Sequence, residues 1–116
     1  MTTEPRPSRG EVWDVDLGVT RGHEQARRRP GLVVSTDRFN HGPAALVIVL
    51  PMTTRAKGIP LHVAVAPPEV GVQETSYVEP EDIRSVSTDR LRERRGKVSA
   101  ATLAAVERRL RVLLEL

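Results

Sequence analysis

Hydrophobic and polar residues alternate along much of the chain between residues 10 and 86, and this alternation predicts short β-strands. In the segment 12–17 the apolar residues Val12, Val15 and Leu17 interleave with acidic ones, which is typical of a half-buried strand. The run 45–50 is continuously apolar, as expected of a central strand covered on both faces. Further strands are predicted at 31–35, which Pro30 opens, and at 61–65, 75–78 and 83–86.

Apolar residues near the C-terminus recur instead at spacings of three and four, which predicts an amphipathic helix. Ser99 is a favourable N-cap residue for this helix. Leu114 and Leu116 widen the apolar stripe near its end. The stripe consists of Leu103, Val106, Leu110 and Leu113.

The segments between these elements carry turn and loop residues. Residues 37–43 include Asn40, Gly42 and Pro43, which predict a turn, and residues 19–29 show no apolar period and are predicted to form a loop. Residues 1–8 are polar with two prolines, so we expect a flexible tail followed by a single domain over 9–116. The whole order predicts a small antiparallel β-barrel or curled sheet with a C-terminal helix packed across it.

Composition narrows the class of protein. A chain of 116 residues with 39% apolar and 28% charged residues is large enough for one core and too short for two. It has no cysteine, which excludes disulfides and thiolate chemistry. The longest apolar run, 44–50, is too short to span a bilayer, and the N-terminus does not resemble a signal peptide. We therefore expect a soluble protein of the cytoplasm.

The net charge of +3 comes mostly from arginine, whose planar guanidinium suits bidentate contacts with phosphate. The densest polar segment is 21–30, which contains four arginines and ends at Pro30. His23 and Glu24 are the candidate proton-transfer groups of this segment. The alternative interpretation is a solvated basic loop. Because Arg29 directly precedes Pro30 at the entry of a strand, rigid structure holds it in place, which favours a functional role.

Thr53 and Thr54 follow the predicted central strand, where side chains emerge from the core. Their hydroxyls can bind a phosphate oxygen, although two threonines in a β-turn would explain the same pattern.

Neither a metal site nor a cofactor motif is predicted. His23, His41 and His62 lie far apart without the spacing of a metal site. Asp14 and Asp16 share the polar face of one strand and are expected to be solvated. Nucleotide-binding loops and the serine-hydrolase elbow are absent from the sequence.

Several separated segments together resemble one known family, the MazF/PemK toxins of type II toxin–antitoxin systems. The resemblance covers about residues 9–116, and several motifs in the same order are more specific than any one of them. The matching segments are Gly10-Glu-Val-Trp-Asp-Val-Asp-Leu17, Gly22-His-Glu-Gln25, Arg29-Pro30, Leu32-Val-Val-Ser35, Leu50-Pro-Met-Thr-Thr-Arg-Ala-Lys-Gly-Ile-Pro60, Asp82-Ile-Arg-Ser-Val86, Arg90-Leu91 and Gly96-Lys-Val98.

This resemblance implies an SH3-like antiparallel β-barrel of the MazF/PemK/CcdB type with a C-terminal helix, assembled as a homodimer. It implies a ribosome-independent, sequence-specific endoribonuclease that needs neither metal nor cofactor. Cleavage of single-stranded RNA would leave a 2′,3′-cyclic phosphate and a 5′-hydroxyl, and it would inhibit translation and growth. A cognate MazE-like antitoxin would cover the RNA site, and DNA would be contacted only through that antitoxin.

The resemblance also implies roles for individual residues. Arg29 and Thr53 take the positions of the catalytic pair, and Glu24 that of an acidic residue implicated in some members. Where this chain has His23 the family usually has serine, so either Glu24 or His23 is the candidate general base. The remaining candidate RNA-binding residues are Arg21, Gln25, Arg27, Arg28, Thr54, Arg55, Lys57 and Arg84.

Two other functions fit a small basic barrel. A CcdB-like toxin binds and inhibits DNA gyrase without cutting anything, and the Arg29-Pro30 and Pro51-Met-Thr-Thr54 motifs argue against it. A non-catalytic RNA-binding barrel is disfavoured because aromatic residues, the usual platforms for stacked bases, make up only 3% of the chain.

Overall fold

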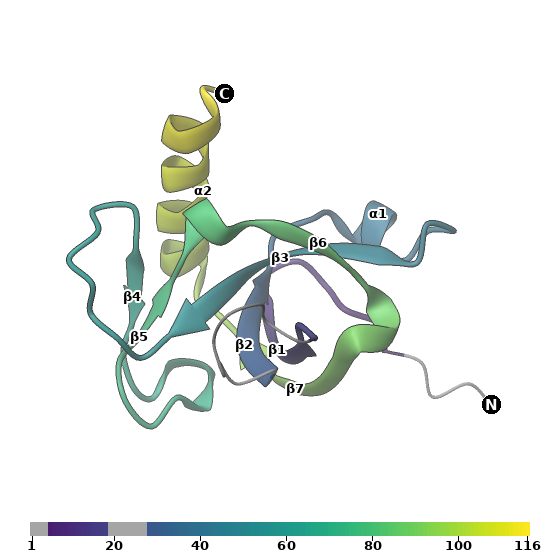
Figure 1. Cartoon of the computed structure of the whole chain (residues 1–116), viewed down its shortest axis with the longest axis horizontal. Coiled ribbons are helices and arrows are strands. Elements are labelled where there is room, and N and C mark those ends of the chain that lie inside the picture. Colours follow the sequence, from purple (N-terminus) through teal and green to yellow (C-terminus); the bar gives the residue numbers. More distant parts are fainter. Residues whose placement is uncertain (1–4, 19–27) are drawn as a thin grey trace.

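The alternating segments form the strands of one curled antiparallel sheet (Figure 1). The computed structural model describes residues 5–18 and 28–116. The strands are β1 (Glu11–Asp16), β2 (Arg28–Val33), β3 (Leu46–Thr53), β4 (Val63–Val65), β5 (Ser76–Val78), β6 (Arg84–Ser87) and β7 (Leu91–Lys97). The helices are α1 (Asp37–Asn40) and α2 (Ala100–Leu114), with 3₁₀ turns η1 (Glu69–Gly71), η2 (Pro80–Asp82) and η3 (Thr88–Arg90).

Strand β3 is the centre of the sheet. The strand order is β4-β5-β3-β2-β1-β7, and β6 also pairs with β3. One edge of β3 pairs with β2, whereas the other pairs with β6 at residues 46–49 and with β5 at residues 52–53. The prediction of a central strand covered on both faces is confirmed, because residues 47 and 49–52 are all buried.

The twofold alternation of each strand divides the core into two clusters on opposite faces of the sheet. One cluster lies under α2 and contains Val12, Leu32, Val34, Leu50, Met52, Val63, Val65, Val78, Val98 and Val106. The other contains Trp13, Val15, Val33, Val47, Val49, Val86 and Leu91. Gly31 allows the closest approach between strands here, because a Cβ at this position would lie 3.0 Å from Val15.

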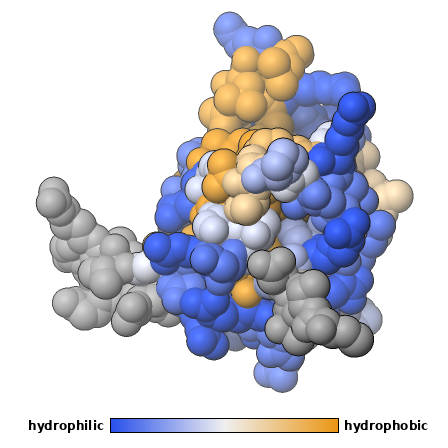
Figure 2. Space-filling model, turned by 90° about the vertical axis from the view of Figure 1, so that its right-hand side faces the viewer, coloured by the Kyte–Doolittle hydropathy of each residue, from blue (hydrophilic) through white to orange (hydrophobic). Residues whose placement is uncertain are grey.

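The C-terminal helix is confirmed, with its N-cap. The Ser99 hydroxyl accepts a hydrogen bond from the amide of Thr102, 3.1 Å away. Val106 is fully buried, and Leu103 and Leu110 pack against the same cluster. The last turn carries apolar residues that face solvent, Val112, Leu114 and Leu116, and Figure 2 shows this apolar end of the helix.

Strand β7 was not predicted, because its sequence is a run of charged residues without apolar alternation. It forms nonetheless by pairing with β1, whose acidic residues form ion pairs with its arginines. Arg95 contacts Asp14 at 2.9 Å and Arg92 contacts Asp16 at 3.1 Å. The expectation that these two aspartates are simply solvated is therefore wrong.

Three local boundaries also differ from the prediction. The turn predicted at 37–43 contains the one-turn helix α1, which Thr36 caps. Strand β2 begins two residues before Pro30, and β3 continues through Pro51 to Thr53. Pro51 has no amide hydrogen to donate to the sheet, but its carbonyl accepts a bond from the amide of Glu79 at 3.0 Å.

Residues at the end of the predicted N-terminal tail pack against the domain. Pro7 is fully buried, and its carbonyl lies 2.7 Å from Nε2 of His41. The amide of Ser8 donates to the carboxylate of Glu11 at 2.8 Å. The packed part of the chain therefore includes Pro7 and Ser8. Neither helix within residues 5–18 and 28–116 is long and apolar enough to cross a membrane.

Glu11 is a buried carboxylate, 9% exposed, that ties the first strand to its surroundings. Burial by itself raises the pKa of Glu11, but hydrogen bonds from Arg94, Ser8 and Trp13 lower the pKa below its ordinary value of 4.5. A carboxyl whose pKa is lower in the folded chain stabilises the fold above the unfolded pKa. That stabilisation is lost as the pH falls through the folded pKa.

We expect Glu11→Gln to lower the free energy of unfolding at pH 7 by about 1–3 kcal/mol. We also expect the variant to lose less stability than the wild type as the pH falls below 4.5. Urea unfolding followed by circular dichroism across this range measures both effects. If the free energy of unfolding falls equally with pH in the two proteins, the lowered pKa of Glu11 does not contribute to acid sensitivity and this assignment is wrong.

Candidate active site

The register between β2 and β3 brings Arg29 close to Thr53. The two strands pair antiparallel, with Gly31 opposite Pro51 as the last pair of the ladder. Continuing this register by two residues sets Arg29 opposite Thr53. On the other edge of β3, Thr53 pairs with Tyr77 of β5. Two residues far apart in sequence thus meet at the end of the sheet's central strand.

The guanidinium of Arg29 is held by two acceptors. Its Nε and Nη2 donate to the carbonyl of Met52 at 3.3 and 3.0 Å. Nη2 also donates to Oε1 of Glu79 at 2.6 Å. Nη1 lies 4.0 Å from Asp82, and the Arg29 side chain is 24% exposed. The group is therefore fixed in orientation and still accessible to a ligand.

Arg29 and Thr53 line the same pocket, which has a volume of about 270 Å³. The hydroxyl of Thr53 accepts a hydrogen bond from the amide of Arg55 at 3.2 Å, so its own hydrogen can be donated to a ligand. The pocket is lined by Arg29, Pro30, Met52, Thr53, Thr54, Arg55 and Ser76. A guanidinium and a hydroxyl at one pocket can together bind a phosphate group.

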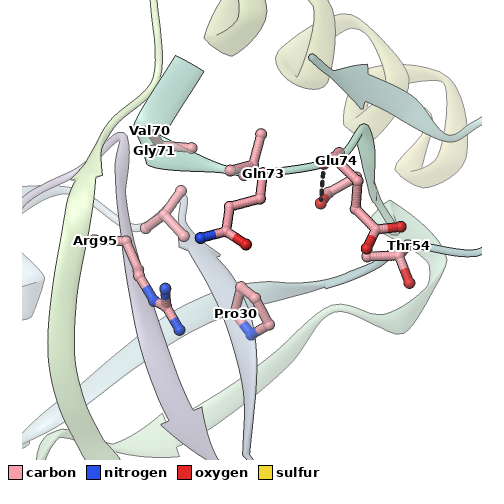
Figure 3. Close-up of a pocket in the computed structure, with 10 residues that line it drawn as sticks. Pro30, Thr54, Val70, Gly71, Gln73, Glu74 and Arg95 are labelled. Atoms are coloured by element: carbon pink, nitrogen blue, oxygen red, sulfur yellow. Dashed lines mark hydrogen bonds between the residues drawn. The ribbon is translucent and has the colours of Figure 1, made fainter. Parts of the chain in front are cut away.

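A second pocket of about 240 Å³ adjoins the first, since Pro30, Thr54 and Ser76 line both. Its other walls include Val12 of β1, Val70 of η1 and Val72, which follows η1. Figure 3 shows the side chain of Gln73 above Pro30 and the side chain of Arg95 to one side of both, and all three residues line this pocket. The two pockets form one surface depression that combines apolar walls with polar groups.

A buried carboxylate links two basic residues at this site. Glu79 is 2% exposed, and its two oxygens contact Arg29 at 2.6 Å and Lys57 at 3.1 Å. Asp82 contacts Arg84 at 3.4 Å. The positive charge of the site is thus partly neutralised by two carboxylates, Glu79 and Asp82, of the segment that follows β5.

The predicted site residues fall into three groups. Thr54 and Arg55 line the pocket with Arg29 and Thr53, and Lys57 joins the site through Glu79. Arg28 is exposed at the start of β2, and Arg84 lies on β6, outside the lining of the pocket. Five of the predicted residues lie outside the described part of the chain: Arg21, His23, Glu24, Gln25 and Arg27.

Sequence reasoning missed Glu79 and Ser76 and assigned no role to Asp82. Glu79 directly follows the strand residues 76–78 and precedes Pro80, a position that predicts an exposed turn residue. Its burial depends on two basic partners that come from other parts of the chain. No local signal in the sequence would have identified it.

One further group of residues could coordinate a cation. His62, Glu79 and Glu81 offer ligand atoms that lie within 4.8 Å of one another. This cluster was not predicted, since sequence reasoning compared the histidines only with each other. Each oxygen of Glu79 already contacts a cationic nitrogen, and His62 contacts Glu81 at 2.6 Å. Contacts within the chain therefore already engage both oxygens of Glu79 and Nε2 of His62, whereas Nδ1 of His62 is buried without a hydrogen-bond partner among the described residues.

Comparison with known proteins places these features in a family. The model of the PemK-like, MazF-like toxins of type II toxin–antitoxin systems matches residues 8–114. The chain is 40% identical over 113 residues to endoribonuclease MazF9 of Mycobacterium tuberculosis, covering 93% of this chain and 96% of that protein.

Solved structures show the same fold. The crystal structure of MazF from Deinococcus radiodurans is similar with a TM-score of 0.80 and 32% identity, over 97% of this chain and 100% of that one. A mycobacterial endoribonuclease in complex with its cognate antitoxin gives a TM-score of 0.77 and 32% identity, over 95% of this chain and 96% of that one. The expected curled β-sheet with a C-terminal helix is confirmed.

Proposed function

Because the chain belongs to the PemK-like, MazF-like family of type II toxin–antitoxin toxins, we propose that it is a sequence-specific endoribonuclease that cleaves single-stranded RNA without a metal. The observation that carries this proposal is the shared pocket of Arg29 and Thr53. A fixed guanidinium beside a free hydroxyl donor suits a reaction in which charge develops on a phosphate.

The substrate supplies its own nucleophile. Attack of the ribose 2′-oxygen on phosphorus forms a pentavalent phosphorane and expels the 5′-oxygen of the next nucleotide. The 2′-hydroxyl loses its proton to a base, and the leaving oxygen gains one. The products are a 2′,3′-cyclic phosphate and a 5′-hydroxyl.

Arg29 acts on the phosphorane through electrostatics. Its guanidinium donates hydrogen bonds to the equatorial oxygens, and the Thr53 hydroxyl donates one more. Arginine is a poor proton-transfer group because its guanidinium keeps its proton at neutral pH. The base is therefore assigned to Glu24 or His23, both in the segment 19–27 outside the described residues.

The test is incubation with a long single-stranded RNA in excess EDTA. We expect cleavage at defined sequences, products with 5′-hydroxyl and cyclic phosphate ends, and no cleavage where a 2′-deoxynucleotide precedes the scissile bond. End mapping by primer extension and mass spectrometry measures this. Intact RNA would favour a gyrase-binding toxin, and cleavage lost in EDTA but restored by Mg²⁺ would indicate a metal-dependent nuclease.

We further infer a homodimer that a MazE-like antitoxin neutralises in the cytoplasm, where its RNA substrates are. The apolar end of α2, with Leu116 84% exposed, supports a protein partner at this surface. The structure of the similar mycobacterial endoribonuclease in complex with its cognate antitoxin supports an antitoxin as the other partner.

A further inference from the structure

We propose that Glu79 is a positioning residue that holds the guanidinium of Arg29 in the orientation required for catalysis. This inference rests on the proposed function, since it assigns Glu79 a role only through Arg29. Three observations carry it: the contact geometry, the burial of the carboxylate and the arrangement of charge around it.

The contacts fix the plane of the guanidinium. Met52 accepts bonds from Nε and Nη2, and Glu79 accepts one from Nη2, so two acceptors together fix the orientation of the group. Nη1 donates no hydrogen bond among the described residues, and it lies 4.0 Å from a carboxylate oxygen of Asp82. The hydrogens of Nη1 are the ones left for a phosphate. Without Glu79 the carbonyl of Met52 alone would hold the group.

Burial makes the carboxylate a rigid support. The side chain of Glu79 is 3% exposed, and a carboxylate is costly to bury unless it is paired on both oxygens. Its position is set by the backbone as well. The amide of Glu79 donates to the carbonyl of Pro51 at 3.0 Å, which ties the end of β5 to β3 beside the pocket. Both acceptors of Arg29 therefore come from ordered chain next to the central strand.

The charge arrangement keeps the site attractive to phosphate. A single carboxylate opposite Arg29 would cancel its charge, but Lys57 contacts the other oxygen of Glu79 at 3.1 Å. The trio of Arg29, Lys57 and Glu79 therefore keeps one net positive charge. Glu79 therefore orients the guanidinium and neutralises only part of the positive charge of the trio.

The test is steady-state kinetics of RNA cleavage for Glu79→Leu and Glu79→Gln, corrected for the folded fraction. Leucine removes the acceptor, and we expect kcat to fall by roughly 10²-fold because misplaced catalytic groups cost about that much, with KM changed by less than about threefold. Glutamine keeps an oxygen that can accept from Arg29, so we expect it to recover most of the loss, to within about tenfold of the wild-type kcat.

Glu11→Gln is the matched control, because Glu11 is also a buried carboxylate paired with an arginine but lies outside both pockets. It should lower stability and leave kcat unchanged. If Glu79→Leu does not fold, Glu79→Gln alone tests the role of Glu79. We expect its kcat to be lower than that of the wild type by about three- to tenfold.

Several results would overturn the inference. They are an unchanged kcat in both Glu79 variants, a rise in KM with constant kcat, equal losses in the two folded variants, or a loss that follows the folded fraction only. The Arg29→Ala variant, measured beside them, separates this failure from that of the proposed function. If Arg29→Ala is inactive while the Glu79 variants are fully active, only the role of Glu79 is wrong.

Discussion

Replacing Arg29 with alanine is expected to lower the rate of RNA cleavage by roughly 10³–10⁵-fold, the range found for arginines that stabilise phosphoryl transition states elsewhere. The physical reason is that the variant loses the group whose donors face the charged oxygens of the phosphorane. Single-turnover cleavage of a fluorescent oligonucleotide measures this rate with enzyme in excess, so weaker RNA binding does not hide the chemical step.

The variant must also be shown to fold. Arg29→Ala leaves one oxygen of Glu79 without its cationic partner, so we expect stability to fall by about 1–3 kcal/mol. Arg108→Ala, on the exposed face of α2, is the control for the same change of net charge. Cleavage by a folded Arg29→Ala protein at the wild-type rate would refute the assignment of the active site.

Replacing Thr53 with alanine is expected to slow cleavage by roughly 10²–10³-fold, the usual effect of removing one hydrogen-bond donor to a developing anion. Thr53 ends β3 and is only half-buried, so the loss of its side chain should alter stability little. The same single-turnover assay measures the effect.

Thr53→Ser is the matched variant, because serine keeps the hydroxyl and loses only the methyl group. We expect it to retain activity within about tenfold of the wild type. If alanine and serine behave alike, the hydroxyl has no part in the chemistry. The double variant Arg29→Ala/Thr53→Ala should be less impaired than the product of the single effects, since the two residues act on one phosphate.

The strands with apolar alternation and the C-terminal helix could be predicted from sequence, because the periods of two and of 3.6 are local properties. Val106 was predicted to face the core and is fully buried, and Ser99 was predicted as the N-cap and accepts the bond from Thr102. Strand β7 could not be predicted in this way. Its arginines are accommodated by Asp14 and Asp16 of β1, which are more than 70 residues away.

The candidate site likewise contains residues that the sequence predicted and one that it did not. The Arg29-Pro30 and Pro51-Met-Thr-Thr54 motifs pointed to two residues that prove to line one pocket. Sequence alone gave no reason to place Glu79 there, because a glutamate before a proline has the local signature of an exposed turn. The partners that bury it, Arg29 and Lys57, are 50 and 22 residues away along the chain.

By itself, then, the sequence determined the type of most elements, the faces they bury and the two motifs to which we assign the chemistry. The tertiary structure decided which strands are neighbours, how far each strand extends, and which carboxylate holds the guanidinium of Arg29. The reason is that hydrophobic period and capping act within one element. Register and ion pairing depend instead on groups that meet only when the sheet closes around its central strand.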